Sequence, residues 1–305
     1  MSGHDGRTVA LTGATGFVGA ETLDQLLAAG FSVRALARRP QPERVGVSWI
    51  AGALDDPASL DALVNGADLV LHIAGVVNAP NRAGFETGNS LGTANMITAA
   101  QRGGIQRFLH VSSVAAREPE LSSYCWSKAL AENHVRTSGL DWTMVRPPAV
   151  YGPRDTEFSE VLRVVRYGFL PAPSEGSASF IHVRDLAALL VALCGKAGDH
   201  YGGAIWEVDD NSPNGLSHRK LAAAFGRALN RNVRIIPLPK AMLWLLSRLG
   251  QVIGGPLAKL TPDRVRYMCH PDWVADEALR PPAAFWRPRI GIDEGFAEIA
   301  AAFRR

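Results

Sequence analysis

The sequence is poor in cysteine. Its 305 residues include three, Cys125, Cys194 and Cys269, and these are widely separated. An odd, scattered set offers neither a disulfide framework nor the close spacing that metal ligands show. We therefore expect no disulfide, no metal site and a reducing, cytoplasmic environment.

An excess of charge of one sign is also missing. The chain carries 32 Lys and Arg against 29 Asp and Glu, a net charge of +3, and no basic run is longer than two residues. Proteins that bind nucleic acid usually carry a basic patch or stripe. The balance therefore argues against a nucleic-acid partner.

Long hydrophobic runs are absent as well. The first ten residues hold no apolar segment before the first strand-like run, so no signal peptide is predicted. The most apolar later stretch, 240–255, is interrupted by Arg248 and is too short to span a bilayer. We expect a helix that packs on the protein as a lid or core helix, with contact to a membrane surface as the alternative.

What the sequence does contain is a glycine motif, TGATGFVG, between an apolar run and an amphipathic pattern. The run 8–11 has the length of a buried strand, and apolar residues then recur at helical spacing until Gly30. Gly13 allows a sharp turn, Gly16 lets a ligand approach the backbone, and Gly19 lets the helix pack on the strand. Free N–H groups at the helix start suit a pyrophosphate, although a glycine turn kept only for packing is the alternative.

Strand-like and helical patterns alternate through the first two-thirds of the chain. This order predicts an α/β fold: a doubly wound parallel sheet of Rossmann type, with a ligand crevice at the carboxyl ends of its strands. The less regular remainder predicts a smaller C-terminal substrate lobe. We expect the dinucleotide-binding domain to take in 1–150 and 177–200, and the lobe 151–176 and 201–305. The predicted strands are 8–11, 31–37, 47–52, 68–75, 107–113 and 141–147, and the predicted helices include 59–66 and 90–104.

Six motifs, in this order, resemble those of the extended short-chain dehydrogenase/reductases. They are TGATGFVG, HIAG, VSS, YCWSK, RPPAVYGP and FIHVRD, and the C-terminal tail looks like that of the dihydroflavonol reductase and 3β-hydroxysteroid dehydrogenase subgroup. The resemblance implies a Rossmann domain with a substrate lobe, a nicotinamide cofactor and oxidoreductase activity. It also implies that Tyr124 is the acid/base, that Lys128 tunes it and holds the cofactor, and that a serine orients the substrate oxygen.

Tyr124 and Lys128 are four residues apart, so they share one face of a helix. An ordinary tyrosine has a pKa of about 10 and is a poor base at neutral pH. A lysine ammonium within about 4–6 Å, together with the positive oxidised nicotinamide, favours the phenolate. We therefore expect a lowered pKa for Tyr124; taken alone, such a pair is more often a solvated surface contact.

Two further polar residues stand near this pair. Ser113, at the end of a predicted strand, is a better candidate than Ser112 for the serine that orients the substrate, since Ser112 can simply satisfy backbone groups. Asn89 matches the family's asparagine ahead of the serine strand, which supports a proton-relay water. Its alternative role is the N-cap of a helix, and one residue can do both.

The choice of cofactor is expected at the end of the second strand. Arg38 and Arg39 stand there without a nearby carboxylate. Arginine suits a 2′-phosphate, whereas an acidic residue would take the ribose hydroxyl of NAD. We therefore predict NADP, with NAD as the second choice and a solvated arginine pair as the alternative interpretation.

The resemblance also implies which residues contact the cofactor. Where the family often has Gly-Asp-Leu after its third strand, this chain has Gly-Ala-Leu at 52–54, so the adenine contact falls to backbone groups or to Asp55. Pro147 would pass beside the nicotinamide, although a rigid turn is its alternative role. The full set is Gly13, Thr15, Gly16, Phe17, Val18, Gly19, Arg38, Arg39, Leu54, Ala74, Gly75, Tyr124, Lys128 and Pro147.

Two lobe segments, 167–180 and 238–260, are rich in apolar residues and poor in charge. As pocket walls they favour an apolar ligand, whereas as lobe core they say nothing about it. We predict an NADP-dependent oxidoreductase acting on a carbonyl or secondary alcohol of a mainly apolar small molecule. The resemblance also makes a homodimer plausible, paired through the helices that carry Asn89 and Tyr124.

Two other functions use the same fold. A nucleotide-sugar epimerase or dehydratase needs polar contacts to a diphosphate, which Arg154, Arg163 or Arg264 would supply. A non-catalytic dinucleotide-binding regulator needs the fold alone. Relatives of that kind commonly lose the tyrosine or the lysine, and this chain keeps both.

Overall fold

The larger part of the molecule is built on a parallel sheet. The structure, a computed structural model, describes residues 6–253 and 260–303. Within these residues a seven-stranded sheet has the order β3-β2-β1-β4-β5-β6-β11, and all its pairs are parallel. This is the order of a Rossmann sheet with one further strand. The strands are β1 (Thr8–Thr12), β2 (Ser32–Ala37), β3 (Val47–Ala51), β4 (Leu69–His72), β5 (Arg107–Val111), β6 (Asp141–Arg146) and β11 (Ile205–Glu207).

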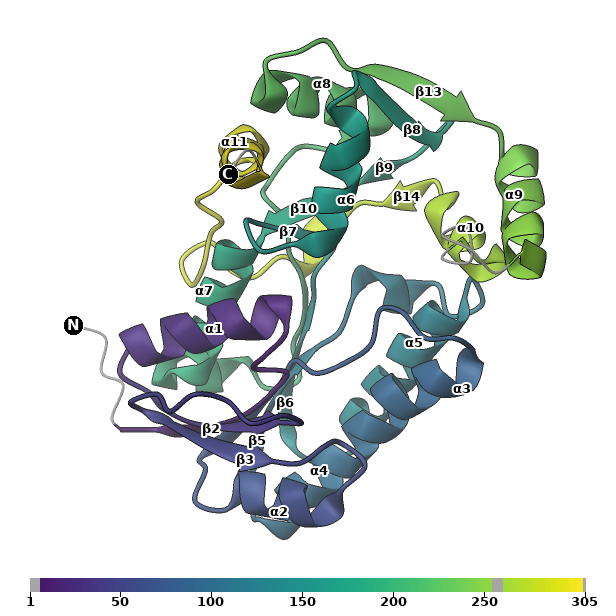
Figure 1. Cartoon of the computed structure of the whole chain (residues 1–305). Coiled ribbons are helices and arrows are strands. Elements are labelled where there is room, and N and C mark those ends of the chain that lie inside the picture. Colours follow the sequence, from purple (N-terminus) through teal and green to yellow (C-terminus); the bar gives the residue numbers. More distant parts are fainter. Residues whose placement is uncertain (1–5, 254–259, 304–305) are drawn as a thin grey trace.

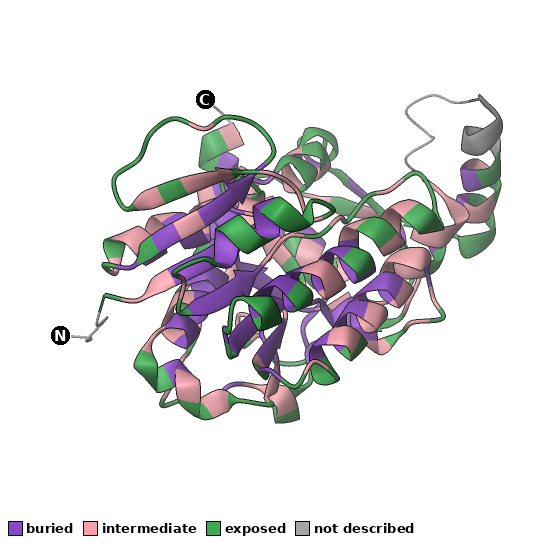
Figure 2. Ribbon diagram, turned by 90° about the horizontal axis from the view of Figure 1, so that it is seen from below, coloured by how far each residue is buried: buried purple, intermediate pink, exposed green. Residues whose placement is uncertain are grey.

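Helices cover both faces of this sheet (Figure 1). They are α1 (Phe17–Ala28) and α7 (Val183–Cys194) on one face and α2 (Pro57–Val64), α4 (Gly92–Arg102) and α5 (Ser123–Arg136) on the other. Because successive strand residues point to opposite faces, Leu11 packs under α1 and α7, whereas Ala10 packs under α2 and α4. The central strands β1, β4 and β5 are therefore buried from both sides, whereas β3 at the edge has no buried residue, and Figure 2 shows both kinds of strand.

All six predicted strands are confirmed, with ends that differ by a few residues. The seventh, β11, lies in the stretch 201–305 that was assigned to the lobe, and this part of the predicted boundary is wrong. Trp206 of β11 pairs with Val145 and so extends the large sheet at its edge. Three residues are too few to show a periodicity, which is why the pattern does not reveal this strand.

The lobe is assembled from short elements (Figure 1). The pair β7 (Ala149–Tyr151) and β10 (Phe180–His182) and the pair β8 (Phe169–Pro173) and β13 (Arg234–Leu238) are both parallel. The other elements of the lobe are α6 (Thr156–Val165), β9 (Ser177–Ala178), β12 (Leu216–Ser217), α8 (His218–Leu229), α9 (Lys240–Ile253), α10 (Pro262–Met268), β14 (Asp272–Trp273), η5 (Glu277–Leu279) and α11 (Ile292–Phe303). Four short helices belong to the larger part instead: α3 (Arg82–Phe85), the π-helix η1 (Glu86–Leu91) and η2 (Val114–Arg117) pack on α5, and η3 (Lys196–Tyr201) packs on α7.

Residues 177–200, which we predict to return to the larger domain, are divided between the two parts of the molecule. α7 packs on α1 and on the large sheet. β9, however, belongs to a small sheet with β12 and β14. The reason is that β9 pairs with strands that come much later in the chain, which no local pattern records.

Aromatic rings fill the core of the lobe. Phe225 and Phe296 are fully buried and stack with their ring centroids 4.6 Å apart. Leu170 and Phe180 join the same cluster. Of the two interpretations of the segment 167–180, lobe core is therefore right for these buried residues and pocket wall is wrong.

The apolar stretch at 240–255 forms α9 as far as Ile253, and its last two residues lie outside the described chain. Leu243 is buried, so the helix packs on the protein. The element that it packs on is α10 (Figure 1). Among residues 6–253 and 260–303, no helix combines the length and the apolar character that crossing a membrane requires.

Candidate active site

The glycine turn between β1 and α1 has the geometry that its motif predicts. Gly13 has a φ of +79°, and a Cβ there would lie 2.8 Å from the backbone nitrogen of Ala74. A Cβ on Gly19 would lie 1.9 Å from the carbonyl oxygen of Gly13. A larger residue at either position would push α1 away from the sheet.

The start of α1 suits an anion. Gly16 is the N-cap, no side chain in the described residues caps this helix, and its first turn holds no acidic residue. The N–H groups of the first turn and the positive end of the helix dipole can therefore take a pyrophosphate. Thr15 is exposed beside them. The side chains of Phe17 and Val18 face the lobe and the core, so their backbone N–H groups are what they offer a dinucleotide.

Other predicted cofactor contacts lie at the same edge of the sheet. Ala74 and Gly75 follow β4, and the backbone N–H of Ala74 donates to the Thr12 hydroxyl over 3.2 Å. Arg38 and Arg39 follow β2, which pairs with β1, and both are exposed. The fold therefore brings the glycine turn, the Ala74–Gly75 segment and the arginine pair to one edge of the sheet.

Leu54 and Pro147 are held by neighbouring residues. Asn95 on α4 donates its side-chain amide to the Leu54 carbonyl over 2.8 Å. Pro147 is buried, and its carbonyl accepts from the N–H of Val114 over 3.1 Å. These contacts fix both residues in place, and cofactor contact stays a prediction for each.

Helix α5 carries both Tyr124 and Lys128. Ser122 caps it, because the Ser122 hydroxyl accepts a backbone N–H of the first turn over 3.2 Å. Lys128 is 6% exposed, and its Nζ donates to the carbonyl of Val111 at the end of β5 over 3.0 Å. Burial lowers the pKa of Lys128 to about 8, and the carboxylate of Glu132, one turn further on, opposes this.

The electrostatic state of Tyr124 differs from the prediction. Burial raises its pKa to about 12, and a hydrogen bond with Ser113 opposes the rise. Two titratable neighbours, Cys125 and Glu157, raise the pKa further. The predicted lowering by Lys128 is therefore wrong for this structure. Its physical reason is that the ammonium is directed to the end of β5 and desolvation dominates at the phenol.

The two serines after β5 have separate environments. Ser112 Oγ donates to Glu132 Oε1 over 2.6 Å, so its proton is already used. Ser113 Oγ accepts from the N–H of Ala115 over 3.2 Å, and the same hydroxyl interacts with Tyr124. A hydroxyl that accepts one bond keeps its own proton for another acceptor. The geometry thus favours Ser113 as the group beside a substrate oxygen.

Asn89 lies inside a helical run rather than at its start. α3, η1 and α4 are continuous, and Asn89 is in the π-helical part, so the N-cap interpretation is wrong. Its Oδ1 accepts from the Val76 N–H over 2.7 Å, and its Nδ2 donates to the Val76 carbonyl over 3.0 Å and to Ser127 Oγ over 2.9 Å. A Cβ on Gly75 would lie 2.8 Å from Asn89 Oδ1 and 4.0 Å from Lys128 Nζ. Asn89 therefore joins the loop after β4 to α5, close to Lys128.

Two aromatic rings that the sequence pattern does not reveal flank Tyr124. Its ring centroid lies 6.0 Å from that of Phe85 on α3 and 6.0 Å from that of Tyr267 on α10. Tyr267 packs on Trp273 at 4.7 Å, and the Trp273 indole N–H donates to the Tyr267 carbonyl over 3.0 Å. The lobe thus completes an apolar wall beside the phenol. In the sequence, the only indication of this wall is the resemblance of the C-terminal tail. That resemblance does not identify the residues that reach Tyr124.

Buried ion pairs fix α5 to the sheet and to the lobe. Glu132 is 1% exposed and accepts from Nε and Nη2 of Arg146, each over 2.7 Å. Arg146 also donates to Glu207 of β11 over 3.2 Å. Glu207 in turn accepts from Arg117 over 3.1 Å and from the backbone N–H of Asp276 over 2.9 Å. Each buried charge therefore has a partner, as buried charges require.

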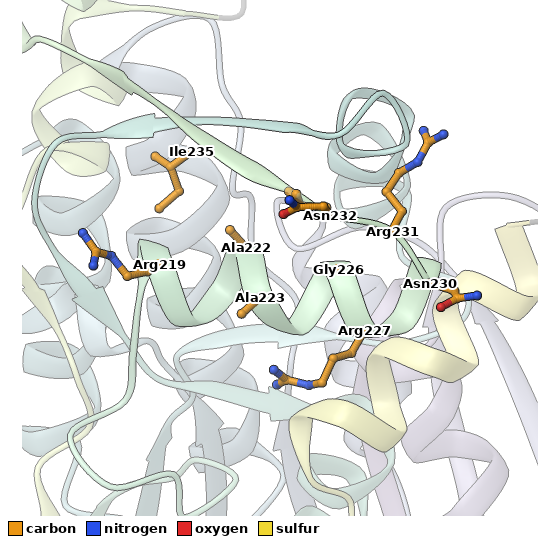
Figure 3. Close-up of a pocket in the computed structure, with 10 residues that line it drawn as sticks. Arg219, Ala222, Ala223, Gly226, Arg227, Asn230, Arg231, Asn232 and Ile235 are labelled. Atoms are coloured by element: carbon orange, nitrogen blue, oxygen red, sulfur yellow. The ribbon is translucent and has the colours of Figure 1, made fainter.

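A surface hollow of about 860 Å³ lies elsewhere, between α8 and β13 of the lobe. Arg219, Arg227 and Arg231 line it, and their guanidinium groups point in different directions (Figure 3). None of the predicted site residues reaches it. With no acid/base group and no converging charges, this hollow is not the candidate active site.

The chain matches a family model and curated relatives. A model described as NAD(P)H-binding matches residues 13–196, more than half of the chain. The ceramide reductase of Caulobacter vibrioides is 34% identical to this chain, over 97% of this chain and 94% of that protein. A putative dihydroflavonol 4-reductase of Synechocystis is 30% identical, over 80% of each protein.

Solved structures share the architecture. MoeE5 in complex with UDP-glucose and NAD matches 98% of this chain and 99% of its own with a TM-score of 0.74, at 20% identity. At that identity the likeness is one of fold. The family model, and the similarity to the ceramide reductase over almost the whole length, are evidence for the family itself. The chain therefore belongs to the NAD(P)H-binding, extended short-chain dehydrogenase/reductase family and is an NAD(P)-dependent oxidoreductase.

Proposed function

We propose that this enzyme is NADP-dependent and reduces a carbonyl on a mainly apolar small molecule. The observation that carries the proposal is the environment of Tyr124. Its pKa of about 12 keeps the phenol protonated, the Ser113 hydroxyl interacts with it, and the rings of Phe85 and Tyr267 flank it. A neutral phenol is the form that gives a proton to a carbonyl oxygen, whereas oxidation of an alcohol would first need the phenolate. Of the two directions, this favours reduction over oxidation of a secondary alcohol.

The site residues divide the chemistry among them. When bound, the reduced nicotinamide supplies the hydride that adds to the carbonyl carbon. Tyr124 gives its hydroxyl proton to the carbonyl oxygen, so that the C=O bond becomes a secondary alcohol. Ser113 donates a hydrogen bond to the same oxygen and orients it. The Lys128 ammonium, held at the end of β5, would hold the cofactor, while Asn89 keeps the loop after β4 against α5.

The dinucleotide would lie along the edge of the sheet already described. The glycine turn and the first turn of α1 would take its pyrophosphate. Leu54, Ala74 and Gly75 would line its adenosine side. Arg38 and Arg39 support NADP over NAD, because a planar guanidinium matches a phosphate with two hydrogen bonds and no carboxylate stands there for a ribose hydroxyl.

The substrate class follows from the wall and from the relatives. Phe85, Tyr267 and Trp273 are apolar neighbours for the group that receives the proton. Two similar proteins are named a ceramide reductase and a putative dihydroflavonol 4-reductase. We therefore propose a ceramide-like ketone as the first substrate to test, and a flavonoid ketone as the second.

A nucleotide-sugar epimerase or dehydratase is less well supported. Arg154 is ion-paired with Glu21 over 3.0 Å and with Asp24 over 3.2 Å. Arg264 donates to an asparagine side chain ahead of α3 over 3.1 Å. Two of the three arginines proposed for a diphosphate are thus already engaged, and Arg163 is exposed on α6. A non-catalytic regulator would have no need for an intact serine, tyrosine and lysine.

We also propose a cytoplasmic homodimer. All three cysteines are free, in keeping with a reducing compartment. α4 and α5 pack side by side on one face of the sheet, and Leu91 ahead of α4 is 47% exposed (Figure 1). A pairing through these helices would cover that side chain.

The test is a substrate screen followed by the loss of reduced-nicotinamide absorbance. The panel holds a ceramide bearing a ketone, a dihydroflavonol, a steroid ketone and UDP-sugars, each with NADPH and with NADH. We expect stoichiometric oxidation of NADPH with an apolar ketone and formation of the alcohol. Conversion of a UDP-sugar without net cofactor consumption would instead establish the epimerase, and cofactor binding without turnover on any panel member would favour the regulator.

A further inference from the structure

Helix α9 exposes apolar side chains along one side. Leu245 is 60% exposed and Met242 is 39% exposed, and both Lys240 and Arg248 are exposed as well. Met242, Leu245 and Arg248 follow one another at three-residue spacing, which places them in one stripe of a helix. We call Met242, Leu245 and Arg248 the α9 face; Lys240, the first residue of the helix, is exposed at its start. Leu243 and Ser247, which are buried, lie on the opposite side.

The charge of this helix has one sign. The sequence of α9 contains Lys240 and Arg248 and no acidic residue. A helix that joins exposed apolar side chains to cations is complementary to an anionic lipid surface, where the apolar groups enter the boundary of the acyl chains and the cations meet the headgroups. The two exposed apolar residues would otherwise stay in water at a cost.

The α9 face lies close in the structure to the proposed chemistry. α9 packs on α10 at the outer edge of the lobe (Figure 1), and in Figure 2 it stands out from the body of the molecule. α10 carries Tyr267, whose ring meets that of Tyr124. Only one helix therefore separates an exposed apolar surface from the candidate acid.

We propose that the α9 face binds the surface of an anionic lipid bilayer, so that a lipid substrate reaches the crevice from the membrane. The occupant is a bilayer rather than a second copy of the chain, because two copies meeting here would bring the cations of both helices together. The binding itself stands on the α9 face alone. Its role in substrate delivery rests on the proposed function.

The first experiment measures binding without any substrate. The full chain is sedimented with vesicles of phosphatidylglycerol and phosphatidylcholine in equal amounts, and with vesicles of phosphatidylcholine alone. We expect binding to the anionic vesicles that is on the order of tenfold tighter than to the neutral ones and that weakens as salt is added.

The variant that tests the surface is Met242→Glu with Leu245→Glu. Its matched control is Val45→Glu with Val164→Glu, because these valines are 97% and 45% exposed and lie outside α9. We expect the α9 variant to lose at least about tenfold in vesicle affinity, since two apolar contacts are lost and two repelled charges are gained. The control is expected to bind as wild type does. Equal binding by both variants, or no binding by the wild type, overturns the proposal.

Light scattering in the absence of vesicles tests the alternative that the α9 face binds a second copy of the chain. A wild-type dimer that becomes monomeric only in the α9 variant would make this face a subunit interface and overturn the membrane proposal. An unchanged oligomeric state together with lost vesicle binding supports it.

Delivery is tested separately, by turnover. The α9 variant should lose activity on a ketone lipid presented in anionic vesicles and keep wild-type activity on a short-chain, water-soluble ketone. If no ketone is turned over by the wild type, the proposed function fails while the vesicle result still stands. If both substrates are turned over normally by the α9 variant, the delivery role fails while the proposed function stands.

Discussion

The two ends of the proposed site are built from different materials. The nucleotide end is backbone and exposed charge: the glycine turn, the open start of α1, and the arginine pair after β2. The substrate end combines the buried Lys128 with the half-buried Tyr124, which the rings of Phe85 and Tyr267 flank. Backbone N–H groups bind an anion whatever the pH, whereas buried side chains have pKa values that their surroundings set. Binding and chemistry should therefore respond to different changes.

Tyr124→Phe is expected to produce the largest difference between the effect on turnover and the effect on cofactor binding. Removing the hydroxyl removes the proposed proton donor, so kcat should fall by about 10²–10⁴-fold, the usual contribution of general acid catalysis. The Kd for NADPH, measured by fluorescence titration, should stay near the wild-type value. Tyr167→Phe, at an exposed tyrosine of the lobe, is the control and should be neutral. Full activity of Tyr124→Phe would show that another group supplies the proton.

The converse change is Arg38→Ala with Arg39→Ala. It should weaken NADPH binding by about 10–100-fold, the effect of losing charged hydrogen bonds of about 1.5–3 kcal/mol, and should leave NADH binding almost unchanged. Titrations with both cofactors give the ratio directly. Arg231→Ala, at an exposed arginine of the lobe, is the matched control. A ratio that stays at the wild-type value would show that the arginine pair is a solvated feature.

The pH dependence of turnover should report on Lys128. Its pKa is lowered from 10.5 to about 8, so its ammonium is complete well below pH 8 and is lost as the pH rises through that value. Reductive kcat/KM should therefore fall through about pH 8, up to about tenfold per pH unit for one essential proton. In Lys128→Arg this fall in kcat/KM should occur at much higher pH, because a guanidinium keeps its charge.

Stability should change in the opposite direction from activity. Between about pH 8 and 10.5 the unfolded chain binds the proton of Lys128 while the folded chain does not, so this group adds to the free energy of unfolding as the pH rises. Urea unfolding across this range, compared with Lys128→Arg, isolates the contribution. If kcat/KM falls at the same pH in wild type and in Lys128→Arg, a group other than Lys128 causes the fall.

The smallest effect is expected at the aromatic wall. Tyr267→Leu removes a ring that meets Tyr124 edge to face, and aromatic pairs contribute about 0.5–1.5 kcal/mol beyond area burial. KM for an apolar ketone should therefore rise a few-fold, with kcat and NADPH binding changed little. Tyr267→Phe keeps the ring and should behave as wild type. A loss confined to NADPH binding would contradict the division between the two ends.

The difference between the ends also explains what the sequence could predict. The glycine turn lies within eight consecutive residues, so its spacing alone predicts the turn, and the alternation of patterns predicts six strands of the large sheet. β11 has three residues and pairs with a strand some sixty positions earlier, which no local pattern records. The wall around Tyr124 combines Phe85 with Tyr267, again far apart along the chain.

Two errors at the site have the same origin. The pKa of Tyr124 was expected to fall because Lys128 shares its helix face, but burial by distant residues dominates and raises the pKa to about 12. Asn89 was weighed as an N-cap because a helix seemed to begin there, but the helical run begins earlier, in α3. Ser113, Tyr124 and Lys128 lie where the prediction placed them in the fold, and their catalytic roles remain to be tested.

Glu207 has a mechanical consequence. Its carboxylate, which is fully buried, accepts from Arg117 and Arg146 of the larger domain and from the backbone N–H of Asp276 in the lobe. Swinging the lobe outward as one piece would pull this N–H away from a buried carboxylate and would also break the hydrogen bond from Arg117 to the Val274 carbonyl. Shifts of α9 and α10 at the rim break neither of these bonds, so substrates should enter and products leave there.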